Sequence, residues 1–207
     1  GRAGFALQYL VGRPSNILQA CTGDQREHYL LPCIRGEKID CLAMTEPGAG
    51  SDLRSMVCRA DADGDEFVIN GTKHFISHAD IADFVILFAS TGEETTSRGV
   101  RKRISAFLID KGTKGFSVRS GYRSVSHRGY HNSILEFENC RVPASQMLGA
   151  KDQGFQVAND WLGATRLQVA AMCLGRPWSW RRIGPHRDSS SDSRSAVFKE
   201  SGSSWPT

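Results

Sequence analysis

Residues 42–51, LAMTEPGAGS, decide how this chain is interpreted, together with residues 70–77, NGTKHFIS. In the first stretch, Pro47 pre-sets one turn dihedral, while Gly48 and Gly50 permit positive φ angles and a close approach by another molecule. This stretch predicts a tight loop that offers N–H groups and hydroxyls to a polar ring edge or a phosphate. The second stretch predicts a strand that ends in an aromatic ring and a hydroxyl.

Composition is that of an ordinary globular protein. The chain has 207 residues, of which 40% are hydrophobic, and a formal net charge of +4, so it is long enough for one or two cores. No membrane or nucleic-acid partner is implied. The longest apolar run, Phe84–Ala89, is too short to span a bilayer. The sequence opens with Gly1 and without a signal peptide, which leaves the true N-terminus open.

The cysteines indicate a reducing compartment. They form no CxxC pair and no group with histidines, so buried reduced thiols in a cytoplasm are favoured over disulfides or a metal site. The six positions are Cys21, Cys33, Cys41, Cys58, Cys140 and Cys173.

The spacing of apolar residues divides this part of the chain into two regions. Residues 1–40 show apolar residues at mixed three and four spacing, which predicts helices, with Pro32 near the end of the last one. From 41 to 147 the period is two, which predicts a β domain, and Asn70-Gly71 is a hairpin signal. The polar segment Gly92–Arg103 is predicted as an exposed loop, although its basic residues could also meet a phosphate. Strands are expected at Glu66–Gly71, Phe84–Ala89, Ser105–Ile109, Phe116–Val118 and Ile134–Phe137.

A long helix is predicted in residues 148–175. After Asp152, apolar residues recur so that one side of a helix is lined by Phe155, Ala158, Leu162, Ala164, Val169 and Met172. The pattern stops at Gly175, and residues 176–207 are rich in serine, arginine and proline, which predicts a disordered tail. Reading the back-translated tail in a shifted frame gives helix-like sequence, so we also hypothesise a frameshift near Arg176 that leaves the chain incomplete.

The TEPGAGSD stretch at 45–52, followed by the GTK-aromatic-I-S/T pattern at 71–77, is similar to the acyl-CoA dehydrogenase family. The resemblance covers roughly residues 14–175. It implies an α+β architecture of N-terminal helices, a central β-barrel or sandwich-like domain and a C-terminal helical bundle, of which this chain contains the start. It also implies FAD between the β domain and the bundle, assembly as a homodimer or tetramer, and, in a eukaryote, the mitochondrial matrix.

The same resemblance implies which residues contact FAD. This chain departs from the commonest pattern, which has tryptophan and threonine where Phe75 and Ser77 stand, but it keeps an aromatic plane and a hydroxyl. For Thr45 and Ser51 the alternative role is turn capping, and for Phe75 it is packing in the core. The implied cofactor-binding residues are Leu42, Ala43, Met44, Thr45, Glu46, Pro47, Gly48, Ala49, Gly50, Ser51, Phe75, Ile76 and Ser77.

Substrate contacts are implied for Ser51 and for a helical segment, Gly163, Ala164, Thr165 and Arg166, whose arginine suits a polar group of CoA. An aspartate often found three residues before that arginine is Gly163 here. Some family branches place the catalytic glutamate where this chain has Thr165, so no catalytic base is assigned. Glu46 and Asp52 are given structural or capping roles by the resemblance.

The implied reaction is FAD-dependent oxidation of an acyl-CoA thioester to the trans-2-enoyl-CoA, with electrons passed to an electron-transfer flavoprotein. A carboxylate removes the α-proton and the β-hydride goes to flavin N5. Two alternatives stay open. One is a flavin monooxygenase or oxidase on the same scaffold, and the other is a non-catalytic remnant, since the chain as written has no assigned base and we expect it to be inactive.

Overall fold

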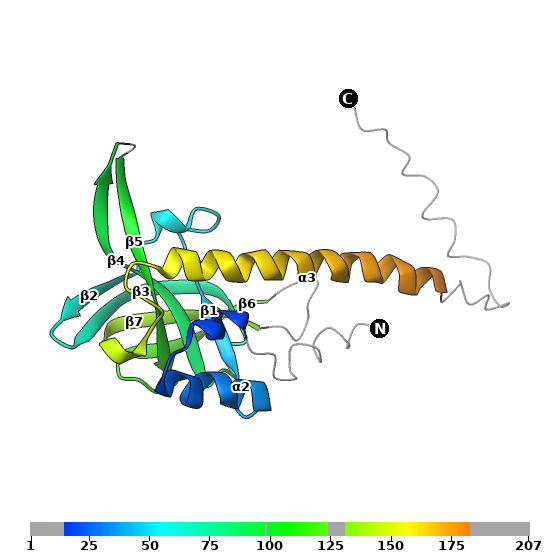
Figure 1. Ribbon diagram of the computed structural model, residues 1–207, viewed down its shortest axis with the longest axis horizontal. Coiled ribbons are helices and arrows are strands. Elements are labelled where there is room, and N and C mark those ends of the chain that lie inside the picture. Colours follow the sequence, from blue (N-terminus) through cyan, green and yellow to red (C-terminus); the bar gives the residue numbers. More distant parts are fainter. Residues whose placement is uncertain (1–14, 98, 124–130, 183–207) are drawn as a thin grey trace. The chain divides into compact units, whose positions relative to one another are not determined.

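The computed structural model describes residues 15–97, 99–123 and 131–182. The chain divides into two compact units, Gly1–Ala164 and Thr165–Thr207. The first unit combines short helices with a curled eight-stranded sheet (Figure 1). This arrangement confirms the α+β class and the β-rich centre that the sequence predicts.

The N-terminal helices are short within the described residues. They comprise the 3₁₀ helix η1 (Asn16–Ala20), the π-helical turn η2 (Arg26–Leu30) and α2 (Leu31–Arg35). The last helix ends at Gly36, whose φ of 74° is left-handed, the usual conformation just past a helix terminus. Residues 24–35 are continuously helical, and Pro32 lies in the first turn of α2, three residues before this helical run ends, as predicted.

The sheet follows the order β6-β7-β3-β2-β4-β5-β8, and β1 pairs with β4 off this path. Strand β1 runs parallel to β4, whereas the long pairs β3–β7 and β4–β5 are antiparallel. Short 3₁₀ turns precede β2 and β8, namely η3 (Leu53–Ser55) and η4 (Ala144–Gln146). The strands are β1 (Asp40–Ala43), β2 (Arg59–Asp63), β3 (Glu66–Ser77), β4 (Phe84–Thr96), β5 (Gly99–Asp110), β6 (Phe116–Arg123), β7 (His131–Pro143) and β8 (Met147–Leu148).

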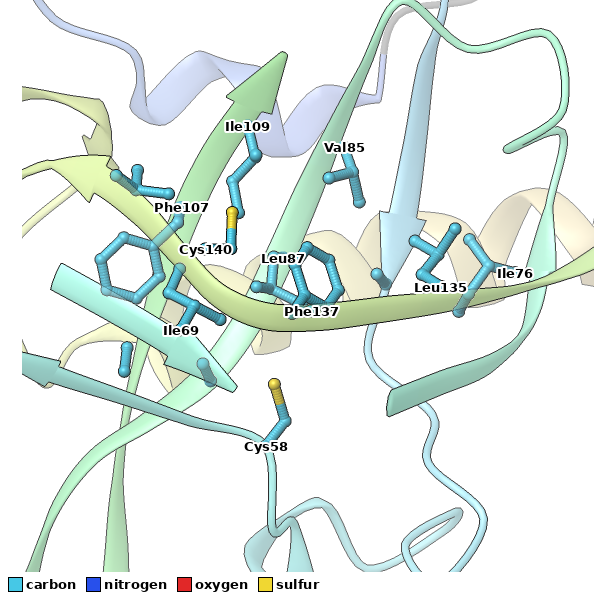
Figure 2. Packing of buried hydrophobic residues seen from close by; sticks show 14 of the residues in the cluster. Cys58, Ile69, Ile76, Val85, Leu87, Phe107, Ile109, Leu135, Phe137 and Cys140 are labelled. Carbon is cyan, nitrogen blue, oxygen red and sulfur yellow. The ribbon is translucent and has the colours of Figure 1, made fainter. Parts of the chain in front are cut away.

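Both faces of the central strands are buried. Along β4, Val85 and Leu87 join one hydrophobic cluster, while Ile86 and Phe88 join a second cluster on the opposite face. Figure 2 shows the first cluster, to which Leu87 of β4 and Phe137 of β7 both belong. A strand buried on both sides reads as a continuous apolar run, which explains why residues 84–89 show no alternation. Every predicted strand lies within an observed one.

The predicted hairpin at Asn70-Gly71 is wrong. These residues lie inside β3, and the turn joining β2 to β3 contains Gly64, whose φ is 60°. Gly71 has another role, because a Cβ there would come within 2.7 Å of the Cα of Cys58. The pairing register of β3 with β7 shifts next to Gly71, so this glycine marks a bulge with close backbone packing.

The loop predicted at Gly92–Arg103 is also wrong. Within this range the described residues belong mainly to β4 and β5, which form a long antiparallel hairpin. Charges of opposite sign face each other across it, as in Glu93 opposite Lys102 and Glu94 opposite Arg101. Such cross-strand pairs stabilise a hairpin without any hydrophobic alternation, and the sequence pattern therefore concealed it.

The long helix α3 spans Gly154–Arg182. Its beginning agrees with the prediction, but it continues beyond Gly175 to Arg182. The remaining residues of the predicted tail, 183–207, lie outside the described residues. No helix in the described part of the chain is long and apolar enough to cross a membrane.

The side of α3 that packs on the sheet agrees with the prediction at Ala158 but not at Phe155. Ala158 is buried, and Val157 and Trp161 pack against the same cluster, whereas Phe155 is 41% exposed and Val169 is 50% exposed. The backbone at Gly154 sets this rotation. A Cβ at Gly154 would lie 2.8 Å from the carbonyl oxygen of Ile104, so the helix approaches β5 where it has no side chain.

The cysteines are free thiols. All are buried except Cys173, whose exposure contradicts the prediction for that position. Burial raises the thiol pKa of Cys21 to about 11, as expected for a group removed from water. The described residues contain no group of side chains able to hold a metal ion.

Candidate functional site

The glycine-rich stretch forms the tight loop that the sequence predicts. The N–H of Glu46 donates to the carbonyl oxygen of Ala49 at 2.9 Å, and the N–H of Ala49 donates back at 3.2 Å. Pro47 and Gly48 lie at the exposed tip, and Ala49 is buried beneath them. A Cβ built on Gly48 or Gly50 would meet nothing within 4 Å, so the space over this loop is open.

A buried ion pair lies under the loop. Glu46 and Lys73 both have fully buried side chains, and Nζ of Lys73 lies 2.7 Å from Oε1 of Glu46. The same ammonium group donates to the carbonyl oxygen of Met44 at 3.0 Å. The carboxylate also accepts from the N–H groups of Val57 at 2.6 Å and Cys58 at 3.1 Å. These contacts satisfy the buried charges, as burial requires.

The second predicted segment lies beside the first. The N–H of His74 donates to the carbonyl oxygen of Thr45 at 2.9 Å, which joins the end of β3 to the loop. The register of β3 against β7 shifts between Lys73 and Ile76, and within this bulge Phe75 has a φ of 55°. Ile76 is buried, while the Phe75 ring is 49% exposed. The bulge thus turns the aromatic ring outward from the sheet.

The exposed ring of Phe75 has an aromatic neighbour that the sequence did not reveal. Tyr122 of β6 stacks on it, with ring centroids 4.1 Å apart and planes 29° apart. The Tyr122 hydroxyl is 3.3 Å from Nδ1 of His74. Strand β7 lies between β3 and β6, so only the folded sheet brings these rings together. The alternative role of Phe75, packing in the core, is therefore not seen.

Several polar groups of the two segments are available to a ligand. The hydroxyls of Thr45 and Ser51 make no hydrogen bond to other described residues, and neither do the N–H groups of Gly50 and Ser51. The alternative role of turn capping for Thr45 and Ser51 is thus not seen in this part of the chain. The hydroxyl of Ser77 donates to Oδ1 of Asn132 at 3.4 Å.

The acidic residues of the loop have structural contacts. Asp52 precedes η3, accepts from the N–H of Arg54 at 3.1 Å and from the hydroxyl of Ser55 at 2.5 Å. These bonds lower the pKa of the Asp52 carboxyl, the contribution of Ser55 being the largest. With Glu46 buried and paired, neither carboxylate is placed to act as a base.

A cavity of about 370 Å³ lies between η3, the β4–β5 hairpin and the start of α3. Four of its side chains are basic and two are acidic, so the cavity has a positive excess. An aromatic ring, Phe155, lines it as well, and the guanidinium carbon of Arg54 lies 5.0 Å from the centre of that ring. The lining residues are Arg54, Glu94, Arg101, Lys102, Arg103, Ile104, Asp152, Gln153 and Phe155.

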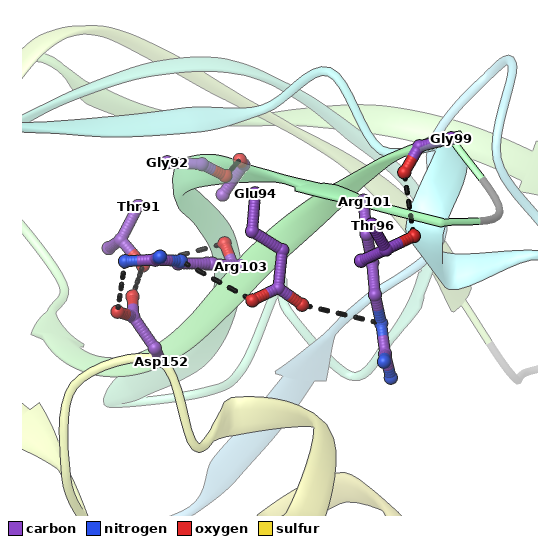
Figure 3. A network of polar contacts seen from close by, with 9 residues as sticks. Thr91, Gly92, Glu94, Thr96, Gly99, Arg101, Arg103 and Asp152 are labelled. Carbon is purple, nitrogen blue, oxygen red and sulfur yellow. Dashed lines mark hydrogen bonds and ion pairs between the residues drawn. The ribbon is translucent and has the colours of Figure 1, made fainter.

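Figure 3 shows the polar network beside this cavity. Asp152 accepts from the hydroxyl of Thr91 at 2.7 Å and lies 3.6 Å from Nη1 of Arg103. Its own N–H donates to the hydroxyl of Ser105 at 2.8 Å. The carboxylate of Glu94 holds the other side of Arg103, at 3.8 Å. The network ties the chain entering α3 to the base of the hairpin and positions the guanidinium of Arg103.

The predicted substrate-binding segment lies on α3. Gly163 and Arg166 are exposed, and Thr165 is half-buried. Thr165 and Arg166 belong to the second compact unit, whereas Gly163 and Ala164 end the first. Their role toward a substrate stays a prediction.

Comparison with known proteins agrees with this geometry. Residues 41–140 match the family model described as acyl-CoA dehydrogenase, middle domain. The chain is 38% identical over 154 residues to a short-chain-specific acyl-CoA dehydrogenase of Clostridium acetobutylicum, covering 74% of this chain and 40% of that protein. The structure of butyryl-CoA dehydrogenase from Megasphaera elsdenii superposes with a TM-score of 0.71 at 32% identity, covering 83% of this chain and 44% of that one.

A prolyl acyl carrier protein oxidase is also similar, with a TM-score of 0.66 and 32% identity, covering 76% of this chain and 41% of that one. The chain belongs to the acyl-CoA dehydrogenase family and contains its middle domain. It spans about two fifths of the length of the relatives that it matches.

Proposed function

We propose that residues 42–51 and 75–77 form part of a binding site for FAD. The observation that carries the proposal is their juxtaposition, because the hydrogen bond from His74 to Thr45 joins segments that are distant in sequence. The open space above Gly48 and Gly50, and the unbonded hydroxyls of Thr45 and Ser51, fit a polar ring edge that needs donors. The exposed ring of Phe75 offers a flat apolar surface beside them.

The test is a titration of the purified chain with FAD. Binding would quench flavin fluorescence and shift its visible absorbance bands. A variant with both Thr45 and Ser51 changed to alanine should bind more weakly, while Ser117→Ala, on the exposed strand β6, should leave the affinity unchanged. Absence of any spectral change with the wild-type chain at high micromolar FAD would contradict the proposal.

We propose that the reaction served by this site is the oxidation of an acyl-CoA thioester to its 2-enoyl product. Bound FAD would supply the hydride acceptor. The cavity with Arg54, Arg101 and Arg103 suits the phosphates of CoA, because guanidinium groups bind phosphate through paired hydrogen bonds. Ser51 and the segment 163–166 are proposed substrate contacts. The carboxylate that removes the α-proton is not assigned to any residue of this chain.

We also propose how the chain divides into domains. Residues 1–40 are proposed as the end of the N-terminal helical domain, 41–147 as the middle β domain, and α3 as the first helix of the C-terminal bundle. Electron-transfer flavoprotein is the proposed electron acceptor, and a homodimer or homotetramer the proposed assembly. The cytoplasm, or the mitochondrial matrix in a eukaryote, is the proposed location.

A second candidate function is oxygen-dependent oxidation on the same scaffold. The similarity to a prolyl acyl carrier protein oxidase favours it. The two candidates differ in their electron acceptor, so reduction of ferricenium without oxygen uptake would support the dehydrogenase. Oxygen consumption coupled to substrate oxidation would support the oxidase.

A further inference from the structure

We propose that the buried pair of Glu46 and Lys73 is a positioning device, which fixes the loop 44–51 against β3 before any ligand binds. The proposed consequence for FAD rests on the proposed function above. The conformational role does not, because it concerns the free protein. Neither side chain has an exposed atom that could touch a ligand, since both are fully buried.

The carboxylate of Glu46 anchors the chain that follows the loop. It accepts hydrogen bonds from Val57 and Cys58, which follow the loop and η3 in sequence. The backbone of Glu46 pairs at the same time with Ala49. One residue therefore holds the beginning of the loop, its tip and the chain that returns from it. Without this carboxylate, the two N–H groups would be left without these acceptors.

The ammonium group of Lys73 anchors the beginning of the loop. It binds Oε1 of Glu46 and the carbonyl oxygen of Met44, the residues that flank Thr45. The next residue of β3, His74, holds the carbonyl oxygen of Thr45 itself. Three consecutive loop residues are thus fixed to two consecutive residues of β3. The bulge that turns Phe75 outward begins directly after these contacts.

Glu46 and Lys73 are charged residues in fully buried positions. A buried ion pair is often no more stabilising than an apolar pair of equal volume, so stability alone is a weak reason for one. An apolar pair would fill the same space but would set no direction for the loop backbone. Through their side chains, Glu46 and Lys73 direct three backbone groups, those of Met44, Val57 and Cys58.

The test compares a double variant, Glu46→Gln with Lys73→Met, with the wild-type chain. Both substitutions approximate the original side-chain shapes and leave no lone buried charge. Amide hydrogen exchange is measured in the absence of ligand. We expect exchange at Val57, Cys58 and residues 44–51 to accelerate about tenfold or more, while exchange in β4 stays unchanged, because opening would be local.

The matched control is Glu66→Gln with Arg141→Met, which removes an exposed ion pair at the other end of β3. It should leave exchange in the loop unchanged. Unchanged loop exchange in the Glu46→Gln, Lys73→Met variant would overturn the inference, and so would an equal acceleration in all strands, which indicates a purely structural pair. If that variant does not fold, Lys73→Arg is measured with the same two criteria.

The FAD titration is then run on the same proteins. We expect the double variant to bind FAD about tenfold more weakly than the wild-type chain and the control variant. If the wild-type chain binds no FAD, the proposed function fails, but the exchange data still decide the positioning role. If all the proteins bind FAD equally, the link between loop position and affinity is overturned.

Discussion

Replacing Lys73 alone by methionine should be among the most destabilising single changes in this chain. The substitution removes the charge partner of Glu46 and two hydrogen bonds, of 2.7 Å to the carboxylate and 3.0 Å to the carbonyl oxygen of Met44. It leaves a fully buried carboxylate with only the N–H groups of Val57 and Cys58. Breaking a buried ion pair in this way costs about 3–5 kcal/mol of folding free energy.

Urea unfolding followed by tryptophan fluorescence and circular dichroism measures this loss. Adding Glu46→Gln to Lys73→Met should restore most of it, since the pair is then neutral. Arg141→Met serves as the control, because its ion pairs are exposed and should contribute little. A loss below about 1 kcal/mol for Lys73→Met would refute the reasoning.

Three further outcomes are expected. Thr45→Ala with Ser51→Ala should weaken FAD binding about tenfold or more, as two hydrogen bonds of about 1 kcal/mol each are lost; titration with FAD measures this. Gly71→Ala should lower the thermal midpoint and cost about 1–3 kcal/mol, because its Cβ would lie 2.7 Å from backbone and side-chain atoms of Cys58. Burial raises the pKa of Asp40 from 3.8 to about 6, so the folded protein holds this proton more tightly and stability falls as the pH rises through that window. Asp40→Asn should therefore stabilise the protein by about 1–2 kcal/mol at pH 8, with little effect near pH 3.5, as judged by urea unfolding.

The parts of the site that depend on local sequence could be predicted. Pro47 favours a turn through its fixed φ, and the structure has that turn, although neither Gly48 nor Gly50 has a positive φ there. The apolar run at 84–89 likewise identifies a strand buried on both faces. The resemblance to a family then added the second segment, Phe75–Ser77, and the structure places it next to the loop.

The parts that depend on tertiary contacts could not be predicted. Tyr122 reaches Phe75 only because β7 lies between their strands and a bulge turns the Phe75 ring outward. The rotation of α3 depends on the contact of Gly154 with the backbone of Ile104, which no periodicity reveals. The hairpin of β4 and β5 was missed because charged cross-strand pairs, and not apolar alternation, accompany it.

The buried pair also explains how a glycine-rich loop can have a defined shape. Glycines at 48 and 50 let a ligand approach the backbone, but they raise the conformational entropy that ordering the loop must overcome. Fixing the loop from above would block the space that a ligand needs. Glu46 and Lys73 fix it from below with fully buried side chains, and of their contacts with the loop and the following chain only the one to the N–H of Val57 is part-buried. The loop is therefore open on the side that we propose binds a ligand, while Glu46 and Lys73 hold its backbone in place from beneath.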